Sequence, residues 1–315
     1  MSPPPRLSHR DVLAATARLS GRVRCTPTVP SSTFDGHLKL ETLQLTGAYK
    51  VRGALHALGR QVERGDRRPV VAASAGNHAA GVAWAARALG LEAVAVVPER
   101  APQAKVARTE ALGARVLRHG ADFEAAYAEA RRLAAARGWR FLHPFDDLEV
   151  IAGQGSIGVE LLPLRPDVVA VPIGGGGLAS GIGTLLRAYG VPVVGVQVQG
   201  VDAMARALGG DTGGLTPPET VADGVCVRRV GALTRAICQE VLDDIVLVSE
   251  AEVQDAMRRL ALHDHVIAEG AGAVAAAALA RLPGRRKVAV VSGGNLDPGC
   301  LARVMAQADL YRPAA

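Results

Sequence analysis

Short, continuously apolar runs alternate with longer amphipathic segments along most of this chain. The apolar runs are rich in valine and lack a polar alternation, as is typical of strands that are buried on both faces. We predict strands at 37–40, 69–73, 93–97, 114–118, 168–173, 192–198, 245–248 and 287–291. Helical patterns lie between them at 78–89, 102–111, 122–137, 178–188, 231–241 and 250–262. This alternation predicts an α/β architecture with mostly parallel sheets.

Length and composition are those of an ordinary globular protein. The chain has 315 residues, enough for one or two domains, with 49% hydrophobic and 21% charged residues. The net charge of +6 comes from scattered basic residues without interleaved aromatic residues, so we expect no nucleic-acid partner. No uninterrupted apolar stretch reaches the roughly 18 residues of a membrane span. Residues 1–10 lack the apolar core of a signal peptide. We therefore expect a cytoplasmic protein that binds no membrane.

The four cysteines show no pattern of a cross-link or a metal site. Cys25, Cys226, Cys238 and Cys300 form no C-x-x-C pair and have no histidine at metal-ligand spacing. We therefore predict buried free thiols, no disulfide framework and no metal site.

Ligands of parallel α/β sheets bind at the carboxyl ends of strands, so the loops after strands are where we expect a site. The first unusual loop, 46–54, contains Lys50, which is one of only four lysines in the chain. A single lysine is usually a surface residue. A cofactor with an aldehyde group, however, requires a lysine that is partly buried and can lose its proton.

Four consecutive glycines, Gly174 to Gly177, followed by Leu178, join the predicted strand 168–173 to the predicted helix 178–188. Such a turn offers backbone N–H groups and a helix N-terminus to a phosphate. The loop lacks the Gly-Lys-Ser/Thr of a Walker motif. It also lacks the register and the acidic residue of a dinucleotide fingerprint. A phosphate monoester site is therefore favoured over a plain flexible turn.

Two further loops carry polar side chains beside small residues. The segment Ser74-Ala75-Gly76-Asn77-His78 precedes a helix and suits a carboxylate, although Ser74 and Asn77 would serve equally well as helix caps. The segment 292–295 begins with Ser292, whose hydroxyl could bind a ring nitrogen. Taken alone, this last segment is better explained as a tight turn.

Together these segments resemble the fold-type II pyridoxal-phosphate (PLP) enzymes, and in particular the serine/threonine dehydratase and serine racemase group. The resemblance extends through nearly the whole chain. Its motifs are Lys39-x-Glu41-x-x-Gln44-x-Thr46-Gly47-Ala48-Tyr49-Lys50-x-Arg52-Gly53-Ala54, Ser74-Ala75-Gly76-Asn77-His78-Ala79, His143-Pro144-Phe145-Asp146-Asp147, Ile151-Ala152-Gly153-Gln154-Gly155, Gly174 to Gly177 and Ser292-Gly293-Gly294-Asn295.

The resemblance implies a role for each loop. Lys50 would hold PLP and then act as the base at the substrate Cα. Asn77 would contact the ring hydroxyl of the cofactor, and Ser292 its pyridine nitrogen. The cofactor phosphate would be bound by Gly174, Gly175, Gly176, Gly177 and Leu178. The substrate would be bound by Thr46, Ser74, Ala75, Gly76, Asn77 and His78.

The resemblance also implies an architecture like that of the tryptophan synthase β subunit, with two three-layer α/β domains. Residues 69–146 would form a small domain, inserted into a large PLP-binding domain made of 1–68 and 147–315. A homodimer is implied as well.

The activity implied is an α,β-elimination that converts L-threonine or L-serine to 2-oxobutyrate or pyruvate plus ammonia. Ala75 stands where racemases of the family have a second catalytic serine, so racemisation is not expected as the main activity. Gln197 and Ala203 replace the acidic residues of the family's cation site, so we predict no metal there. Gly270 stands where proline is usual, which leaves the substrate open.

Alternative functions remain at this stage. One is a dehydratase for another β-hydroxy amino acid, such as phenylserine or hydroxyaspartate. The absence of an extra arginine from the four loops argues against hydroxyaspartate. The others are a β-replacement synthase and a non-catalytic binder of PLP or an amino acid.

Overall fold

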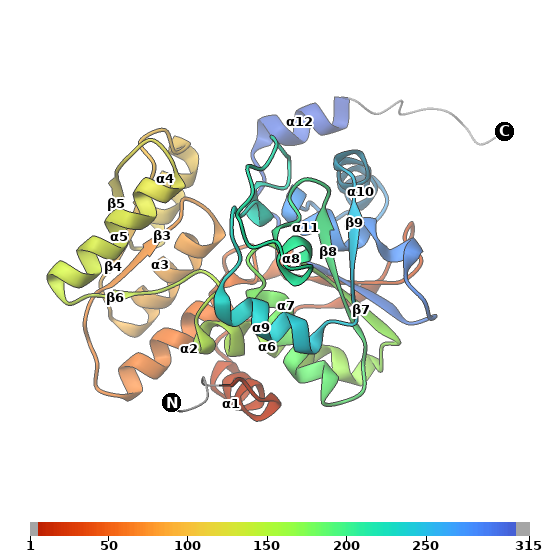
Figure 1. Cartoon of the computed structure of the whole chain (residues 1–315), viewed down its shortest axis with the longest axis horizontal. Coiled ribbons are helices and arrows are strands. Elements are labelled where there is room, and N and C mark those ends of the chain that lie inside the picture. Colours follow the sequence, from red (N-terminus) through yellow and green to blue (C-terminus); the bar gives the residue numbers. More distant parts are fainter. Residues whose placement is uncertain (1–5, 307–315) are drawn as a thin grey trace.

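Two separate β-sheets organise the chain, and the computed structural model describes residues 6–306 (Figure 1). The larger sheet has the strand order β1-β2-β10-β7-β8-β9, and the smaller has the order β5-β4-β3-β6. β1 runs antiparallel to β2, and the other strand pairs are parallel. The strands are β1 (Thr28–Pro30), β2 (His37–Leu40), β3 (Val70–Ala73), β4 (Ala93–Val97), β5 (Arg115–Arg118), β6 (Arg140–Phe141), β7 (Val168–Pro172), β8 (Val193–Val198), β9 (Asp244–Val248) and β10 (Lys287–Val291).

The α/β prediction is confirmed, and all eight predicted strands lie within one residue of their expected bounds. The patterns missed β1 and β6. Both are only two or three residues long, which is too short for a recognisable apolar run.

The predicted helices are also confirmed to within one residue, as α3 (Asn77–Leu89), α4 (Gln103–Ala111), α5 (Phe123–Arg137), α7 (Gly177–Arg187), α9 (Ala232–Val241) and α10 (Glu250–Leu262). Further helices are α1 (His9–Leu19), α2 (Lys50–Glu63), α6 (Leu148–Leu161), α8 (Ala203–Leu208), α11 (Gly270–Ala277) and α12 (Pro298–Ala306). Short 3-10 turns are η1 (Glu41–Leu43), η2 (Leu162–Leu164), η3 (Asp223–Val225) and η4 (Leu279–Arg281).

Helices α2, α6 and α7 pack closely because glycines line their contacts. A Cβ on Gly53 of α2 would lie 2.4 Å from the Gln154 side chain of α6. A Cβ on Gly155 would lie 2.7 Å from the carbonyl oxygen of Gly181 in α7. The sequence patterns missed α2 and α6. The same glycines bring the N-terminus of α2, which carries Lys50, against the centre of the molecule.

Each sheet is covered on both faces, as the three-layer prediction requires. In the smaller sheet, Val70 and Ala72 of β3 pack with α2 and α3, whereas Val71 and Ala73 pack with α5. In the larger sheet, one face packs with α10 and α11 and the other with α7 and α9. Valines buried on both sides explain the continuous apolar runs in the sequence.

The smaller sheet lies entirely within the predicted small domain, 69–146, because its strands fall between Val70 and Phe141. Helix α2 packs against this sheet although it lies outside that range. The exact domain boundaries therefore remain a prediction.

Candidate active site

The lysine loop and the Ser292 loop lie side by side. Ala48 and Gly293 form an isolated antiparallel bridge, and the Tyr49 amide donates to the Ser292 carbonyl at 3.1 Å. Asn295 joins the third loop, because its Nδ2 donates to Thr46 O at 2.8 Å and to Asn77 Oδ1 at 2.6 Å. Three of the four predicted loops are therefore hydrogen-bonded to one another.

Lys50 is the first residue of α2, and its half-buried side chain points to the loop after β6. Its Nζ donates to Pro144 O at 2.9 Å. Burial lowers the pKa of Lys50 to about 8, and this effect is only partly opposed by the Glu269 carboxylate. With this pKa roughly a tenth of the side chain is free amine at pH 7, far more than for an ordinary lysine, and this fraction can act as a nucleophile and a base.

A buried ionic network holds the start of α2 in place. Arg52 donates to both oxygens of Glu41 at 2.8 Å, and its Nη1 donates to Glu160 Oε1 at 2.6 Å. Lys39 Nζ binds the other oxygen of Glu160 at 2.5 Å. Two cations thus meet two carboxylates, which leaves no buried charge unpaired. Three residues of the lysine motif therefore position Lys50, and sequence reasoning had not identified their partner Glu160.

The glycine loop forms an open cradle of main-chain donors. Among residues 6–306, no acceptor binds the N–H groups of residues 174–179. Gly176 has φ 94°, and a Cβ on Gly175 would lie 2.4 Å from the Phe145 ring, so side chains are excluded from both positions. Unpaired N–H groups at the N-terminus of α7 suit the phosphate of PLP.

A second set of free N–H groups begins α3. Asn77, His78 and Ala79 have amides without an acceptor in the described part of the chain, and Gly76 N donates to Ser74 Oγ at 3.1 Å. The His78 ring turns away, with its Nε2 3.0 Å from Leu142 O. Burial lowers the pKa of His78 to about 3, so the ring is neutral. If His78 binds the substrate carboxylate, it therefore does so through its backbone N–H and not through its ring.

Ser292 lies directly after β10 and is buried. Its hydroxyl donates to Ala271 O at 3.3 Å, at the start of α11. It is a neutral group at the position where the resemblance expects the partner of the pyridine nitrogen.

The comparisons with known proteins agree with this geometry. The model of the pyridoxal-phosphate dependent enzyme family matches residues 19–293. The chain belongs to this family. The enzyme is 42% identical to the L-threonine ammonia-lyase of Thermotoga maritima over 85% of this chain and 69% of that one. It is 40% identical to the catabolic L-threonine dehydratase TdcB of Escherichia coli K12, over 91% of this chain and 92% of that one. The solved structure of processed threonine deaminase isoform 2 from Solanum lycopersicum has a TM-score of 0.88 and 33% identity, covering 96% of this chain and 92% of that one.

The family and these structural neighbours confirm both the fold-type II architecture and PLP as the cofactor of the enzyme. A phosphate cradle and an amine that can lose its proton are the kinds of group that this cofactor requires, and the free amides at 174–179 and the low-pKa amine of Lys50 match them.

Sequence reasoning assigned no role to Glu269, although the enzyme places it in the site. Glu269 precedes α11, and its Oε1 accepts from Asn77 Nδ2 at 2.6 Å. Burial raises the pKa of Glu269 to about 7. The only sequence feature that could have indicated Glu269 as a site residue is its position next to the small residues 270–273.

The cysteine prediction was correct for pairing but wrong for burial. All four thiols are free, yet only Cys238 is buried, whereas Cys25 is exposed and Cys226 and Cys300 are half-buried. Cys25 follows the turn after α1 at the surface, where the fold leaves its side chain in solvent.

No group of three or more His, Cys, Asp or Glu side chains within residues 6–306 is arranged to hold a metal ion. Gln197, which was predicted to replace an acidic residue of the family's cation site, is fully buried. Its side-chain amide binds three main-chain groups. Its Nε2 donates to Ile173 O and Val201 O, and its Oε1 accepts from Ala205 N. Among the same residues, no helix has the length and apolarity needed to cross a bilayer.

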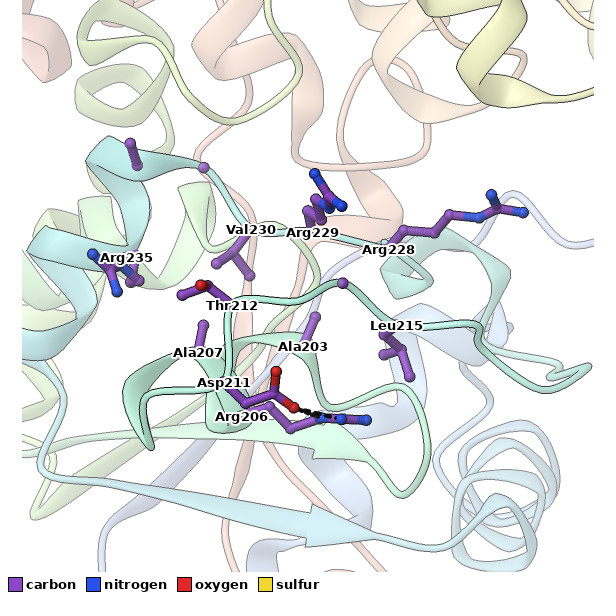
Figure 2. A pocket seen from close by; sticks show the side chains of 13 residues that line it. Ala203, Arg206, Ala207, Asp211, Thr212, Leu215, Arg228, Arg229, Val230 and Arg235 are labelled. Atoms are coloured by element: carbon purple, nitrogen blue, oxygen red, sulfur yellow. Dashed lines mark hydrogen bonds and ion pairs between the residues drawn. The ribbon is translucent and has the colours of Figure 1, made fainter.

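A separate pocket of about 170 Å³ lies between α8 and α9 (Figure 2). None of the predicted site residues lines it. Its arginines reach solvent, and Arg206 pairs with Asp211 at 2.5 Å. The pocket therefore lies outside the site described above.

Proposed function

We propose that the enzyme removes water and then ammonia from small L-β-hydroxy amino acids, converting L-threonine to 2-oxobutyrate and L-serine to pyruvate. The observation that carries this proposal is the convergence of Lys50 with the loops at Ser292 and Asn77. The relatives named L-threonine ammonia-lyase and L-threonine dehydratase support the choice of substrate.

The cofactor would be held by groups from all four loops. Its phosphate would bind the amides of Gly174 to Leu178, and Lys50 would form the covalent bond to it. Ser292 would offer its hydroxyl to the ring nitrogen of the cofactor. Asn77 would offer its side-chain amide to the ring hydroxyl. When bound, PLP supplies an electron sink for the electron pair left at the substrate Cα.

The substrate carboxylate would bind at the N-terminus of α3. The free amides of Asn77, His78 and Ala79 converge there, and the helix dipole favours an anion. Thr46 and the loop from Ser74 to Gly76 would complete this subsite. Holding the carboxylate here would orient the Cα–H bond for removal.

Lys50 would take the proton from Cα. Its lowered pKa keeps a useful fraction of the side chain as free amine near neutral pH. Breaking the Cβ–O bond then releases the hydroxyl as water, and water from solvent hydrolyses the product to a 2-oxo acid and ammonia. Ala75 offers no proton on the opposite side, so return of a proton to form the D-isomer is not expected.

Ser292 supports elimination over transamination. A carboxylate at the ring nitrogen would hold a proton there, whereas the neutral hydroxyl of Ser292 does so poorly. Expulsion of the β-substituent is then the favoured outcome once the Cα proton has left.

A homodimer in the cytoplasm is also proposed. The family resemblance is what supports the dimer, and Leu43 and Ile267, each 48% exposed, are candidate residues of its interface. Sedimentation of the PLP-loaded protein tests the dimer, and a monomer at micromolar concentration would contradict it.

The decisive experiment measures 2-oxo acid release by the PLP-loaded protein from L-threonine, L-serine and L-threo-phenylserine in parallel. We expect release from threonine and serine. Release from phenylserine alone would retain the elimination but change the substrate. If the enzyme releases no 2-oxo acid but makes a thioether amino acid when a thiol is added, it is a β-replacement synthase instead.

A further inference from the structure

The proposed elimination needs an acid as well as a base. Lys50 would take the proton from Cα, but the β-hydroxyl must gain a proton to leave as water, because hydroxide is a poor leaving group. A group with a transferable proton and an atom open to the cleft is therefore required at the site.

Glu269 lies between loops that belong to the two sheets. Its main-chain N–H donates to Gly293 O at 3.1 Å, in the loop after β10 of the larger sheet. Its Oε1 accepts from Asn77 Nδ2 at 2.6 Å, at the start of α3 on the smaller sheet. The residue is only 7% exposed. The carboxyl group is thus held in one place where the two sheets meet.

In the described chain, hydrogen bonds reach only one of the two carboxyl oxygens of Glu269. Oε2 has no partner among residues 6–306, and it is not one of their enclosed polar atoms that lack a partner. Oε2 therefore faces open space. Two glycines leave room beside the carboxyl group, since an added Cβ would lie 2.4 Å from Oε1 at Gly293 and 4.0 Å from it at Gly224.

The surroundings keep a proton on Glu269 near neutral pH. Burial raises the pKa of Glu269 to about 7, and the carboxylate of Asp223 adds to the increase. The hydrogen bond from Asn77 and the charges of Lys105 and Arg108 lower this pKa, but they do not offset the effect of burial. With this pKa, about half of the Glu269 side chains carry a proton at pH 7.

Other polar groups of the site are less suitable as the acid. The Glu269 carboxyl also acts on Lys50, which serves as the base, and on Tyr49. Burial raises the pKa of Tyr49 far above neutral, so its phenol is a very weak acid. His78 and Ser292 already donate their protons to main-chain carbonyl oxygens. Glu269 combines a transferable proton with an open oxygen.

We propose that the carboxyl group of Glu269 is the acid that protonates the β-hydroxyl as the Cβ–O bond breaks. The inference rests on the proposed elimination, in which Lys50 takes the Cα proton. A positioned acid of this kind contributes typically about 100-fold or more to a rate, provided that its pKa lies near the working pH.

The step balances without an oxidant or another co-reactant. The Cα–H and Cβ–O bonds break, and a double bond forms between Cα and Cβ. The Cα proton passes to Lys50, and the Glu269 proton leaves in the water molecule. Lys50 then gives a proton to solvent, and Glu269 takes one back from solvent.

Leaving groups of different basicity test the assignment. The hydroxyl of L-serine needs a proton to leave, whereas 3-chloro-L-alanine loses chloride, which needs none. Pyruvate release from both is measured with PLP-loaded wild type, Glu269→Gln and Glu269→Asp. We expect Glu269→Gln to lower kcat at least about 100-fold for serine and less than about threefold for chloroalanine. Glu269→Asp should recover part of the serine activity, because it restores a carboxyl group.

The variant Glu269→Gln keeps an acceptor for Asn77, and exposed Glu219→Gln is the matched control that should change neither reaction. Equal losses on both substrates in Glu269→Gln would show that Glu269 only positions Asn77, and would overturn the inference. An unchanged rate on serine would overturn it as well. If the wild type releases no 2-oxo acid from serine or threonine, the proposed elimination itself is rejected, and the assignment with it.

The pH dependence gives a second comparison. Since the protonated form of Glu269 is the acid, kcat of the wild type for serine should fall as pH rises through about 7, whereas kcat for chloroalanine should not. The same decline for both substrates would contradict the assignment.

Infrared difference spectra of the PLP-loaded protein provide a readout besides activity. The C=O stretch of a protonated carboxyl group should be present at pH 6, decrease as pH rises through 7, and be absent from Glu269→Gln. Identical spectra of wild type and Glu269→Gln in this region would show that Glu269 holds no proton to give.

Discussion

Asn77 Nδ2 donates a 2.6 Å hydrogen bond to Glu269 Oε1, although the two residues are 192 positions apart and lie at the N-termini of α3 and α11, which pack on different sheets. Asn77 Oδ1 at the same time accepts from Asn295 Nδ2. Both ends of the Asn77 amide are therefore fixed, and Glu269 becomes a buried titratable group at the site.

We predict that Glu269 makes stability depend on pH. Its pKa is about 7 in the folded protein and 4.5 ordinarily, so the stabilising contribution of its protonated form is complete below pH 4.5 and is lost as pH rises through 7. This difference corresponds to about 3 kcal/mol. Glu269→Gln keeps an acceptor for Asn77 and cannot ionise. Relative to wild type, its free energy of unfolding should therefore rise by about 3 kcal/mol between pH 4.5 and pH 8.

Urea unfolding at the two pH values measures this effect. Exposed Glu219 provides the control, and Glu219→Gln should leave the pH dependence of the wild type unchanged. Parallel stability curves for wild type and Glu269→Gln would rule out the ionisation of Glu269 as the cause.

Lys50 should control the uptake of PLP by the apoenzyme. With a pKa of about 8, roughly a tenth of Lys50 is free amine at pH 7, against roughly one part in 3,000 for an ordinary lysine. The uptake rate should therefore rise about tenfold per pH unit and level off above about pH 8. Stopped-flow absorbance of the lysine-bound cofactor measures this rate. A rate that still rises tenfold between pH 9 and 10 would be incompatible with the lowered pKa.

Replacement of Lys50 should abolish both cofactor attachment and catalysis. In Lys50→Ala, neither 2-oxo acid release nor the absorbance of a lysine-bound cofactor is expected. An unchanged absorbance in this variant would assign the covalent bond to another lysine.

The sequence was sufficient to predict the loops of the site because parallel strands end at the same edge of a sheet. This rule located Lys50, Gly174 to Gly177 and Ser292 from strand patterns that the fold confirms. It could not locate Glu269. The contact of Glu269 with Asn77 depends on how the two sheets face each other, and no local pattern records that orientation.

Local propensity also failed where packing overrides it. Helices α2 and α6 were not predicted, although their glycines allow the close contact that buries both helices. The ring of His78 shows another limit of prediction from sequence. The sequence shows that His78 lies in the loop, but it does not show which way the side chain points.

The shape of the phosphate cradle should depend on Gly176. A Cβ there would lie 2.5 Å from Met204 Cε at a φ of 94°. We expect Gly176→Ala to lower the free energy of unfolding by about 1–3 kcal/mol and to weaken PLP binding at least about tenfold. Gly59→Ala, in α2, is the control, because nothing lies within 4 Å of its added Cβ. It should stabilise the protein by up to about 1 kcal/mol. Urea unfolding and PLP titration measure the two effects, and tight PLP binding by Gly176→Ala would show that the cradle tolerates a side chain.

Gln197 should make the enzyme independent of divalent cations. Its amide both donates to Ile173 O and Val201 O and accepts from Ala205 N, so the main-chain groups around it are already satisfied without a cation. We expect neither EDTA nor millimolar Mg²⁺ or Ca²⁺ to change the activity or melting temperature of the wild type.

The variant Gln197→Glu tests this explanation by restoring the carboxylate. A buried carboxylate cannot donate to the two carbonyl oxygens, so the variant should lose roughly 2–4 kcal/mol of stability at pH 8. Ca²⁺ or Mg²⁺ should recover part of this loss, because a carboxylate and carbonyl oxygens are suitable ligands for either ion. Gln197→Met should be destabilised without any recovery by cations, since it supplies no charge. Activation of the wild type by a divalent cation would contradict this prediction, because it would show that the enzyme binds a cation despite the amide of Gln197.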